Sequence, residues 1–466
     1  MAEIKTDVVV IGAGPAGYVC AIRLAQYGKK VVVVEEAELG GTCLNVGCIP
    51  SKALILAGQF MEDARSASEM GITVGEPKLD LAQLVDWKQG IVKRLTGGVE
   101  MLFKKRSIEW LKGTARIASP NAVDVKTAEG AVRVTALDVV VASGSEPSTF
   151  PGWEFGEHIW SSTEALAPKK LPARLVVVGG GYIGMELGMF YAHAGSKVTI
   201  VEATPGILPG TDPELSKVVA RKAKKAGIEI LTGSFAREWK KKGKGLEITV
   251  ENGGEMRAMA SDQILMTVGR KPRTQDLGLD AVGLTPDKQG FIATDHQRQT
   301  RTRHVWAIGD AAGQPMLAHK GSAEGLAAAA AIAGKPGAAF DAKVVPAVIF
   351  TDPEIAYVGL TEAEAKEKGH EVRIGKFSFG ANGRALSLRR AEGFVKVVAD
   401  AQDDVILGVQ MVGPEVTELI AEAAVAIEAG LTAEDLALTV HAHPTLPEVL
   451  MEACEDVHGL AVHSAK

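Results

Sequence analysis

The sequence has few cysteines, few aromatic residues and no surplus of basic charge. Its 466 residues include 4 cysteines and 5% aromatic residues, and the net charge is −6 at pH 7. Four cysteines are too few for the disulfide framework of a small secreted domain. Nucleic acids and anionic membranes favour clustered Lys and Arg, which this acidic chain does not supply. We therefore expect neither nucleic acid nor a membrane as a partner.

Long apolar segments are also lacking. No apolar run reaches the roughly 18 residues of a membrane span, and a first strand from about Asp7 leaves no room for a signal peptide. The one basic run, residues 240–244, is short and interrupted by Gly243, which indicates a solvated hairpin or loop. Length and composition are those of a globular protein of about three domains. We expect a protein of the reducing cytoplasm. A dithiol in that compartment is more often catalytic than structural.

The chain begins with a dinucleotide-binding pattern, in which an apolar strand is followed by a glycine-rich turn, a helix and a second strand that ends in an acid. These parts are the strand at residues 7–11, the turn with Gly12, Gly14 and Gly17, the helix to about Tyr27, and the strand at 30–34 before Glu35. The glycines permit a tight turn and close approach of a pyrophosphate, and the acid binds a ribose hydroxyl. Glycines alone would be a weak signal, but the complete unit predicts a nucleotide site.

Two cysteines, Cys43 and Cys48, follow this unit. An ideal helix would hold their Cα atoms roughly 8–9 Å apart, whereas a disulfide needs them within about 7 Å. If the two bridge, the backbone between them cannot be regular helix, and Gly47 is placed to absorb the distortion. Pro50 suits the first turn of a helix over residues 51–61. A cysteine pair that can bridge only when its backbone bends suits a disulfide that opens and closes during a reaction. The alternative is two buried structural thiols. The other cysteines, Cys20 and Cys454, are expected to be inert on helices.

The dinucleotide-binding unit occurs a second time. Its parts are the strand at residues 175–178, the turn with Gly179, Gly181 and Gly184, a helix to about Ala194, and the strand at 197–201 before Glu202. The interval from the first glycine to the acid is the same in both units, so the chain carries two Rossmann-like units and two nucleotide sites. A redox dithiol directly after the first unit suggests a bound flavin there. The second unit would then hold a nicotinamide cofactor that exchanges.

Two further candidate sites lie in the second half of the chain. A short strand over residues 303–310 ends in Asp310, and open α/β sheets bind ligands at the carboxyl ends of their strands; an ordinary helix N-cap is the alternative. His443 precedes a proline and Glu448 follows five residues later, which suits a general base and its orienting acid. The alternative is a helix N-terminus with a satisfied histidine. Because His441 and His443 lack a third ligand cluster, no metal site is expected.

These motifs together resemble the pyridine nucleotide–disulfide oxidoreductases. The resemblance is carried nearly end to end by residues 12–35, 40–52, 179–202, 307–310, 316–320 and 441–448. Glutathione and trypanothione reductases of this family usually carry basic residues for a 2′-phosphate where this chain has Glu202. Mercuric reductases add a C-terminal cysteine pair, which this chain lacks. One departure is Ser143, where the family often has Thr, and this change keeps a hydroxyl.

The resemblance implies a flavin-dependent, NAD-linked oxidoreductase that acts on a dithiol. Dihydrolipoamide would react with a Cys43–Cys48 disulfide, and electrons would pass through FAD to NAD⁺. His443 would take the substrate proton while Glu448 holds its ring. An alternative within the family is a low-molecular-weight disulfide reductase that resembles glutathione reductase. An alternative from another class is a flavoprotein sensor or scaffold, which would need none of these four side chains.

The resemblance also assigns cofactor contacts. Lys52 would reach the flavin ring with Glu186 as its partner, and Asp310 would bind the ribityl chain of FAD. Tyr182 would cover the flavin until nicotinamide displaces it; simple packing is the alternative. Further cofactor contacts are expected at Gly41, Thr42, Gly113, Ala318 and Gly269.

The implied fold class is α/β, with two Rossmann-like domains for FAD and NAD and a C-terminal α+β dimerisation domain. The expected bounds are 1–147 and 273–343 for the two parts of the FAD-binding domain, 148–272 for the NAD-binding domain and 344–466 for the dimerisation domain. The implied partners are a second copy of the chain, as a homodimer, and lipoyl domains. These lipoyl domains would belong to 2-oxo-acid dehydrogenase complexes or to the glycine cleavage system.

Overall fold

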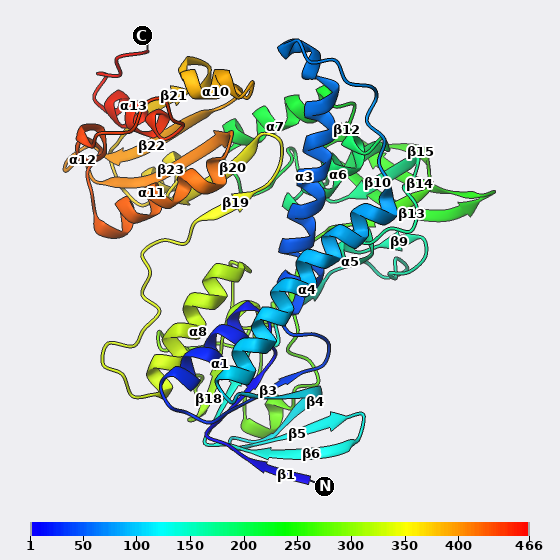
Figure 1. Cartoon of the computed structure of the whole chain (residues 1–466), viewed down its shortest axis with the longest axis vertical. Helices are drawn as coiled ribbons and strands as arrows, with labels where there is room; N and C mark the ends of the chain where they lie inside the picture. Colours follow the sequence, from blue (N-terminus) through cyan, green and yellow to red (C-terminus); the bar gives the residue numbers. More distant parts are fainter. Residues whose placement is uncertain (1, 465–466) are drawn as a thin grey trace.

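The computed structural model describes residues 2–464 and is an elongated molecule of three parts (Figure 1). One part, with the N-terminus, lies at one end, and the other two lie side by side at the opposite end. Helix α3 (Cys48–Arg65) runs from the first part towards the other two. Residues 40–52, here called the redox segment, therefore lie near the place where the first part meets the other two.

The first part is built on an eight-stranded sheet in the order β1-β6-β5-β4-β3-β2-β7-β18. Its strands are β1 (Ala2–Lys5), β2 (Val8–Ile11), β3 (Val31–Glu35), β4 (Glu109–Ser119), β5 (Ala122–Thr127), β6 (Gly130–Thr135), β7 (Asp138–Val141) and β18 (Val305–Ala307). The neighbours β4, β3, β2, β7 and β18 pair in parallel. Every residue of β2 is buried, which is the environment that a continuous valine run favours. Helices α1 (Pro15–Gln26) and α8 (Ala318–Ile332) pack side by side against this sheet.

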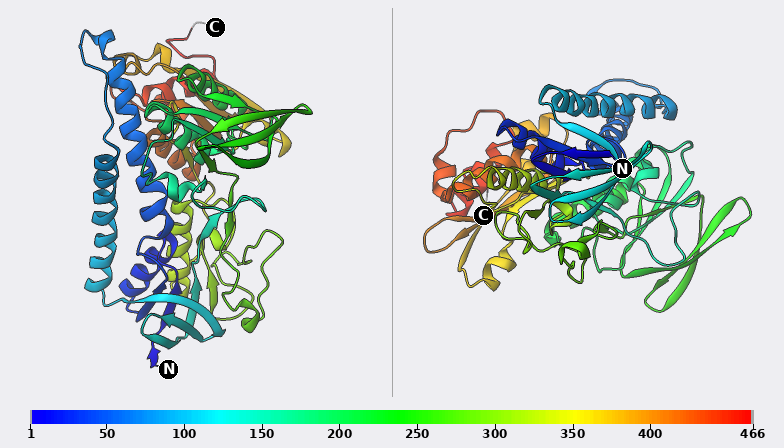
Figure 2. Two further views of the ribbon diagram at one scale, coloured as in Figure 1. Left: turned by 90° about the vertical axis from the view of Figure 1, so that its right-hand side faces the viewer. Right: turned by 90° about the horizontal axis from the view of Figure 1, so that it is seen from below.

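The second part repeats this plan around a parallel five-stranded sheet in the order β12-β11-β10-β16-β9. Its strands are β12 (Glu229–Leu231), β11 (Lys197–Val201), β10 (Arg174–Val178), β16 (Gln263–Met266) and β9 (Ile159–Trp160). Its helices are α5 (Ser162–Ala165), α6 (Tyr182–His193) and α7 (Pro213–Lys225). A three-stranded antiparallel sheet projects from it (Figure 2): β13 (Ser234–Lys242), β14 (Gly245–Asn252) and β15 (Glu255–Ser261). The basic run at 240–244 forms its hairpin, as predicted.

A two-stranded ribbon joins these two parts. It pairs β8 (Ser145–Pro147) with β17 (Arg270–Pro272) in antiparallel register. The chain enters the second part after β8 and leaves it at β17, and then returns to complete the first sheet with β18. The ribbon therefore lies where the two nucleotide-binding units connect. The residue bounds given above for the domains remain predictions.

The third part is an antiparallel sheet with helices, which confirms the expected α+β texture after about residue 344. Its strand order is β19-β20-β23-β22-β21. The strands are β19 (Ala347–Ile349), β20 (Glu354–Gly359), β21 (Val372–Ser378), β22 (Phe394–Asp400) and β23 (Ile406–Gly413). The helices are α9 (Glu362–Glu367), α10 (Gly383–Ser387), α11 (Val416–Ala429), α12 (Ala433–Leu438) and α13 (Glu448–Val457).

The redox segment lies on helix α2 (Gly41–Val46) and on the start of α3. The long helix α4 (Leu81–Lys105) follows α3 in the chain. Helix α3 packs against α6 and α4. By hydropathy and length alone, the helical stretch Gly41–Arg65 could cross a membrane, with a third of its most apolar window buried. A single stretch of this kind is weak support for a membrane span, and this one is interrupted at Gly47.

Charged side chains hold the second and third parts together. Lys396 of β22 is buried, with 3% of its side chain exposed, and it donates to Asp212 and to Glu214 Oε1, the latter at 2.9 Å. Lys376 of β21 donates to the other oxygen of Glu214. These hydrogen bonds lower the pKa of Glu214 from 4.5 to about 2. Because the folded-state pKa is depressed, this stabilisation is present above about pH 4.5 and is lost as the pH falls towards 2.

We therefore expect the thermal midpoint of the unaltered protein to fall more steeply between pH 5 and pH 3 than that of Glu214→Gln, which cannot titrate at this position. The corresponding loss in the free energy of unfolding should be on the order of 1 kcal/mol larger for the unaltered protein. The effect is this small because Glu214 is partly exposed and solvent screens its ion pairs. Differential scanning calorimetry across this pH range measures it. The exposed Glu76→Gln is the control and should follow the unaltered protein; identical pH slopes for all three proteins would contradict the account.

Candidate active site

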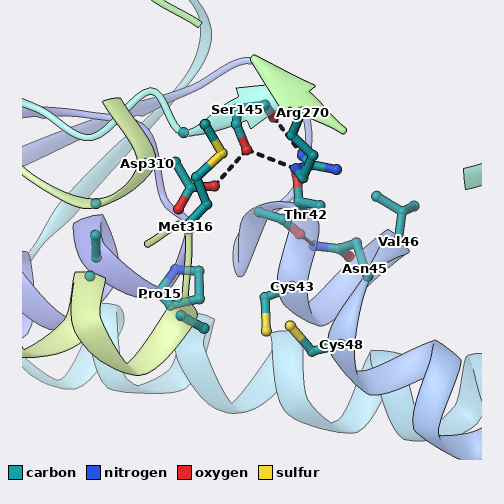
Figure 3. A pocket seen from close by; sticks show the side chains of 18 of the residues that line it. Pro15, Thr42, Cys43, Asn45, Val46, Cys48, Ser145, Arg270, Asp310 and Met316 are labelled. Carbon is teal, nitrogen blue, oxygen red and sulfur yellow. Dashed lines mark hydrogen bonds between the residues drawn. The ribbon is translucent and has the colours of Figure 1, made fainter. Parts of the chain in front are cut away.

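The two cysteines of the redox segment meet because the helix is broken between them. Helix α2 ends before Gly47, whose φ of −144° and ψ of −111° are not helical, and α3 begins at Cys48. A Cβ at Gly47 would lie 2.8 Å from the carbonyl oxygen of Thr42, so a larger residue would push the two helices apart. The sulfur atoms of Cys43 and Cys48 point towards each other (Figure 3). The predicted break at Gly47 is confirmed, although α3 begins at Cys48 instead of about Ser51.

Both cysteines are free thiols, and they form a hydrogen bond with each other. This hydrogen bond lowers the pKa of Cys48 to about 7; desolvation in the cavity opposes the shift, and the nearby Lys52 ammonium supports it. The same hydrogen bond, together with burial, raises the pKa of Cys43. Cys48 is therefore the thiolate of the reduced pair, and Cys43 is the thiol that donates to it. The disulfide itself stays a prediction.

Lys52 lies one turn of α3 beyond Cys48 and forms the ion pair that the resemblance implied. Its Nζ donates to Oε2 of Glu186 at 2.8 Å, and it lies 4.5 Å from the centre of the Phe350 ring. Glu186 is buried, with 3% exposed, and its second oxygen accepts from the Phe350 N–H at 2.9 Å. A buried carboxylate with both oxygens engaged fixes the ammonium beside the dithiol.

The dithiol opens into a cavity of about 500 Å³, here called the first cavity, at the carboxyl ends of the parallel strands of the first sheet. The predicted residues that line it are Gly12, Gly14, Glu35, Gly41, Thr42, Cys43, Cys48, Lys52, Tyr182, Glu186, Asp310 and Ala318. Gly12 has a φ of +103°, and a Cβ there would lie 2.2 Å from the Ala142 carbonyl oxygen, so only glycine fits this turn. Helix α1 begins at this cavity without a side-chain cap, which leaves N–H groups for a phosphate.

Two predicted residues do not line the first cavity. A Cβ at Gly17 would lie 2.0 Å from the Gly12 carbonyl oxygen, and one at Gly113 would lie 2.5 Å from that of Lys126. Gly17 therefore allows α1 to pack on the glycine turn, as the fingerprint requires. Gly113 allows close pairing of β4 with β5 and does not line the first cavity, and its contact with a cofactor stays a prediction.

Asp310 lies in a short 3-10 turn at the end of β18 and lines the first cavity. It does not cap this turn, because the N-cap residue is Ile308 and makes no side-chain hydrogen bond. One oxygen of Asp310 accepts from the Ser145 hydroxyl at 2.5 Å. The predicted ligand position is therefore supported over the N-cap alternative. Neither Ser145 nor its second partner, Arg270, was predicted as a site residue.

The second nucleotide-binding unit forms a cavity of about 950 Å³, here called the second cavity. Gly179, Gly181, Tyr182, Glu202 and Gly269 line it, whereas Gly184 does not. A Cβ at Gly184 would lie 2.0 Å from the Gly179 carbonyl oxygen, the same packing contact as at the corresponding glycine of the first unit.

The two acids that end the second strands are held in the same way. Glu35 accepts from the N–H groups of Ala13 at 2.8 Å and Ala37 at 2.9 Å. Glu202 accepts from those of Gly180 at 2.6 Å and Thr204 at 2.7 Å. Each carboxylate therefore accepts one N–H group from its glycine turn and one from the residue two positions after the acid itself. These bonds fix it at the edge of its cavity. This is where a ribose hydroxyl would be recognised.

Tyr182 lies between the two cavities and lines both of them. It is the first residue of α6, and 43% of its surface is exposed. A half-exposed ring that separates two nucleotide cavities is suited to cover one until a ligand enters the other. Its role as a cover over the first cavity stays a prediction.

The His443 and Glu448 side chains form the expected pair in the third part. Nδ1 of His443 lies 2.9 Å from Oε1 of Glu448, whose second oxygen accepts from the Thr445 N–H at 2.7 Å. Partial burial raises the pKa of Glu448, but the Thr445 N–H and the His443 ring outweigh it and hold this pKa below its usual value. The His443 side chain is 80% exposed and does not line the first cavity. Its neighbour His441 has partners of its own, Glu422 and the Thr439 carbonyl.

The other two cysteines lie on helices, as predicted, and both are buried in the cores. Cys20 on α1 and Cys454 on α13 are both fully inaccessible to solvent. Burial raises the pKa of Cys20 to about 12 and also raises that of Cys454. Neither thiol can form a thiolate at neutral pH, so both are inert.

The chain belongs to the pyridine nucleotide–disulphide oxidoreductases. The family model matches residues 6–325, and the model of the family's dimerisation domain matches residues 345–454. These enzymes use FAD and NAD, and both cavities fit such cofactors. The first cavity has a ribose-binding acid, the uncapped start of α1 and Asp310 beside the dithiol. The second has the corresponding acid and glycine turn.

Relatives and solved structures of this family resemble the whole chain. The dihydrolipoyl dehydrogenases of Geobacillus stearothermophilus and Bacillus subtilis are both 46% identical to it, over 99% of this chain and 98% of theirs. LpdA of Mycobacterium tuberculosis is 26% identical, with a TM-score of 0.90 over 98% of this chain and 99% of that one. The flavoprotein disulfide reductase RclA of Escherichia coli is 25% identical, with a TM-score of 0.88 over 97% of this chain and 99% of that one.

The low pKa of Cys48 predicts its reactivity in the reduced protein. Iodoacetamide should alkylate Cys48 with a pH midpoint of about 7, because the thiolate is the nucleophile. Lys52→Met removes the nearby ammonium and should move this midpoint to higher pH. The control is Lys112→Met, whose ammonium pairs with Glu38 on the surface. Rates of alkylation, read by mass spectrometry of the Cys48 peptide, test this; a midpoint that stays unchanged in Lys52→Met would contradict the electrostatic account.

Proposed function

We propose that the chain oxidises dihydrolipoamide to lipoamide and reduces NAD⁺ to NADH, through FAD and the Cys43–Cys48 pair. The observation that carries the proposal is the pair of facing sulfur atoms in a cavity separated by Tyr182 from a second nucleotide cavity. The names of the relatives at 46% identity favour dihydrolipoamide as the substrate over a low-molecular-weight disulfide. A sensor or scaffold would need neither the dithiol nor the His443–Glu448 pair.

The chain's own residues account for the proton and thiol chemistry. A substrate thiolate attacks Cys43 of the oxidised pair, and Cys48 leaves as a thiolate, which its low pKa favours. The second substrate thiolate then attacks the mixed disulfide at the substrate sulfur, so that lipoamide forms and Cys43 is released. His443 accepts the substrate protons, and Glu448 holds its ring in the required tautomer. FAD held in the first cavity by the glycine turn, Glu35 and Asp310 would accept two electrons from the dithiol, and NAD⁺ held in the second cavity would accept them from it as a hydride.

A second copy of the chain would account for the position of His443. It is exposed in the third part and does not line the cavity that holds the dithiol. The third part matches the family's dimerisation domain, and twofold dimers are the commonest soluble assemblies. We therefore assign His443 to the dithiol of a partner in a homodimer. Lipoyl domains of a 2-oxo-acid dehydrogenase complex or of the glycine cleavage system would deliver the substrate, in a reducing cytoplasm.

A substrate panel tests this function. The purified protein should contain FAD and should reduce NAD⁺ with dihydrolipoamide, while NADH or NADPH with oxidised glutathione gives little activity. Cys43→Ser and Cys48→Ser should each abolish the reaction, because either change removes the disulfide. Cys20→Ala is the control, since that thiol lies outside the cavity. Faster turnover of glutathione than of dihydrolipoamide would favour the alternative reductase.

The position of Glu202 predicts a preference for NAD⁺ over NADP⁺. Its carboxylate is fixed at the edge of the second cavity, where it accepts from a 2′-hydroxyl and repels a 2′-phosphate. Glu202→Gln should lower the ratio of kcat/KM for NAD⁺ over NADP⁺ by about tenfold, corresponding to about 1.4 kcal/mol. Glu35→Gln, the same change in the first unit, should leave this ratio unaltered. Equal kcat/KM for both cofactors in the unaltered protein would defeat the assignment.

A further inference from the structure

The ribbon of β8 and β17 carries a hydrogen-bonded chain that reaches from one nucleotide cavity to the other. Ser145 begins β8, Arg270 begins β17, and Asp310 lies beyond the end of β18. These three residues come from three separate stretches of sequence. Figure 3 shows them joined by dashed lines above the dithiol.

Arg270 holds Ser145 with one edge of its guanidinium. Nε donates to Oγ of Ser145 at 2.8 Å, and Nη2 donates to its carbonyl oxygen at 2.7 Å. Oγ in turn donates to Oδ2 of Asp310 at 2.5 Å. Because Nε can only donate, the hydroxyl proton of Ser145 must point to Asp310. Ser145 is 6% exposed, so water does not compete for these bonds. We call this chain the Arg270 clamp.

The clamp leaves groups free at both ends. Within residues 2–464, no ion pair joins Arg270 or Asp310 to another charged side chain, and the Ser145 hydroxyl bridges the guanidinium and the carboxylate. Oδ1 of Asp310 remains available to a ligand in the first cavity. A guanidinium has five N–H groups, of which the clamp uses two. Arg270 lines the second cavity as well as the first, so its free edge is available to an anionic ligand there.

We infer that Arg270 is a positioning residue that couples the two nucleotide sites through Ser145. It fixes the orientation of Asp310 and so raises the affinity of the first cavity for FAD. A nicotinamide nucleotide bound at the free edge restrains the guanidinium without breaking the clamp. Occupation of the second cavity therefore slows release of FAD from the first. This inference rests on the proposed function, because it places FAD and NAD⁺ in these two cavities.

The test is the rate of FAD release from the holoenzyme, followed by the rise in flavin fluorescence, with and without saturating NAD⁺. In the unaltered protein, NAD⁺ should slow release at least about fivefold, the lower end of typical coupling between sites. Ser145→Ala breaks the clamp but does not touch the second cavity. It should release FAD faster, still bind NAD⁺ in a titration of the holoenzyme but about fivefold more weakly because the coupling is reciprocal, and show no effect of NAD⁺ on release.

Two further variants separate charge from geometry. Arg270→Lys keeps the charge but cannot hold Ser145 with two parallel N–H groups, so it should also lose the NAD⁺ effect. Lys271→Gln removes the neighbouring side chain of the same ribbon, which pairs with Glu146, and should behave as the unaltered protein. The coupling is overturned if NAD⁺ does not slow release from the unaltered protein, or slows it equally in Ser145→Ala. A chain that binds no FAD would overturn the proposed function and the coupling with it.

Discussion

The break in the helix at Gly47 is the constraint on which the redox centre depends. A continuous helix would separate the two cysteines beyond the reach of a disulfide. The close approach of Gly47 to the Thr42 carbonyl lets two helices meet with their sulfur atoms face to face. The hydrogen bond between the thiols then divides their roles, because it favours the thiolate at Cys48 and disfavours it at Cys43. Lys52, held by the buried Glu186, adds to this asymmetry.

Much of this arrangement could be predicted from the sequence, because the features involved are local. Both nucleotide units have their glycines, helix and terminal acid within one short interval, and the structure holds Glu35 and Glu202 in equivalent ways. The Cys-x-x-x-x-Cys spacing alone required a break, and Gly47 was the residue that could provide it. His443 and Glu448 are five residues apart, so their pairing is also a local property.

Other features could not be predicted, because their causes lie in distant residues or contradict local propensity. Helix α4 contains Gly97 and Gly98, which disfavour a helix, but the residues that follow them, Val99 and Phe103, pack into the core of the first part. Arg270 and Ser145 are 125 residues apart, so no spacing rule could join them. The close approach of β4 and β5 at Gly113 is a tertiary contact that the sequence did not reveal, while the cofactor contact expected at Gly113 stays a prediction. In each case the feature depends on a tertiary contact.

The account depends most on a division of the active site between two copies of the chain, with the dithiol from one and His443 from the other. The direct test is a mixed dimer of differently tagged Cys43→Ser and His443→Ala chains, purified through both tags. If His443 acts across the twofold axis, one site carries both defects and the other is intact, so activity should be about half that of the unaltered dimer. If His443 acts within its own chain, each site keeps one defect. A mixed dimer as inactive as its two parents would contradict the account.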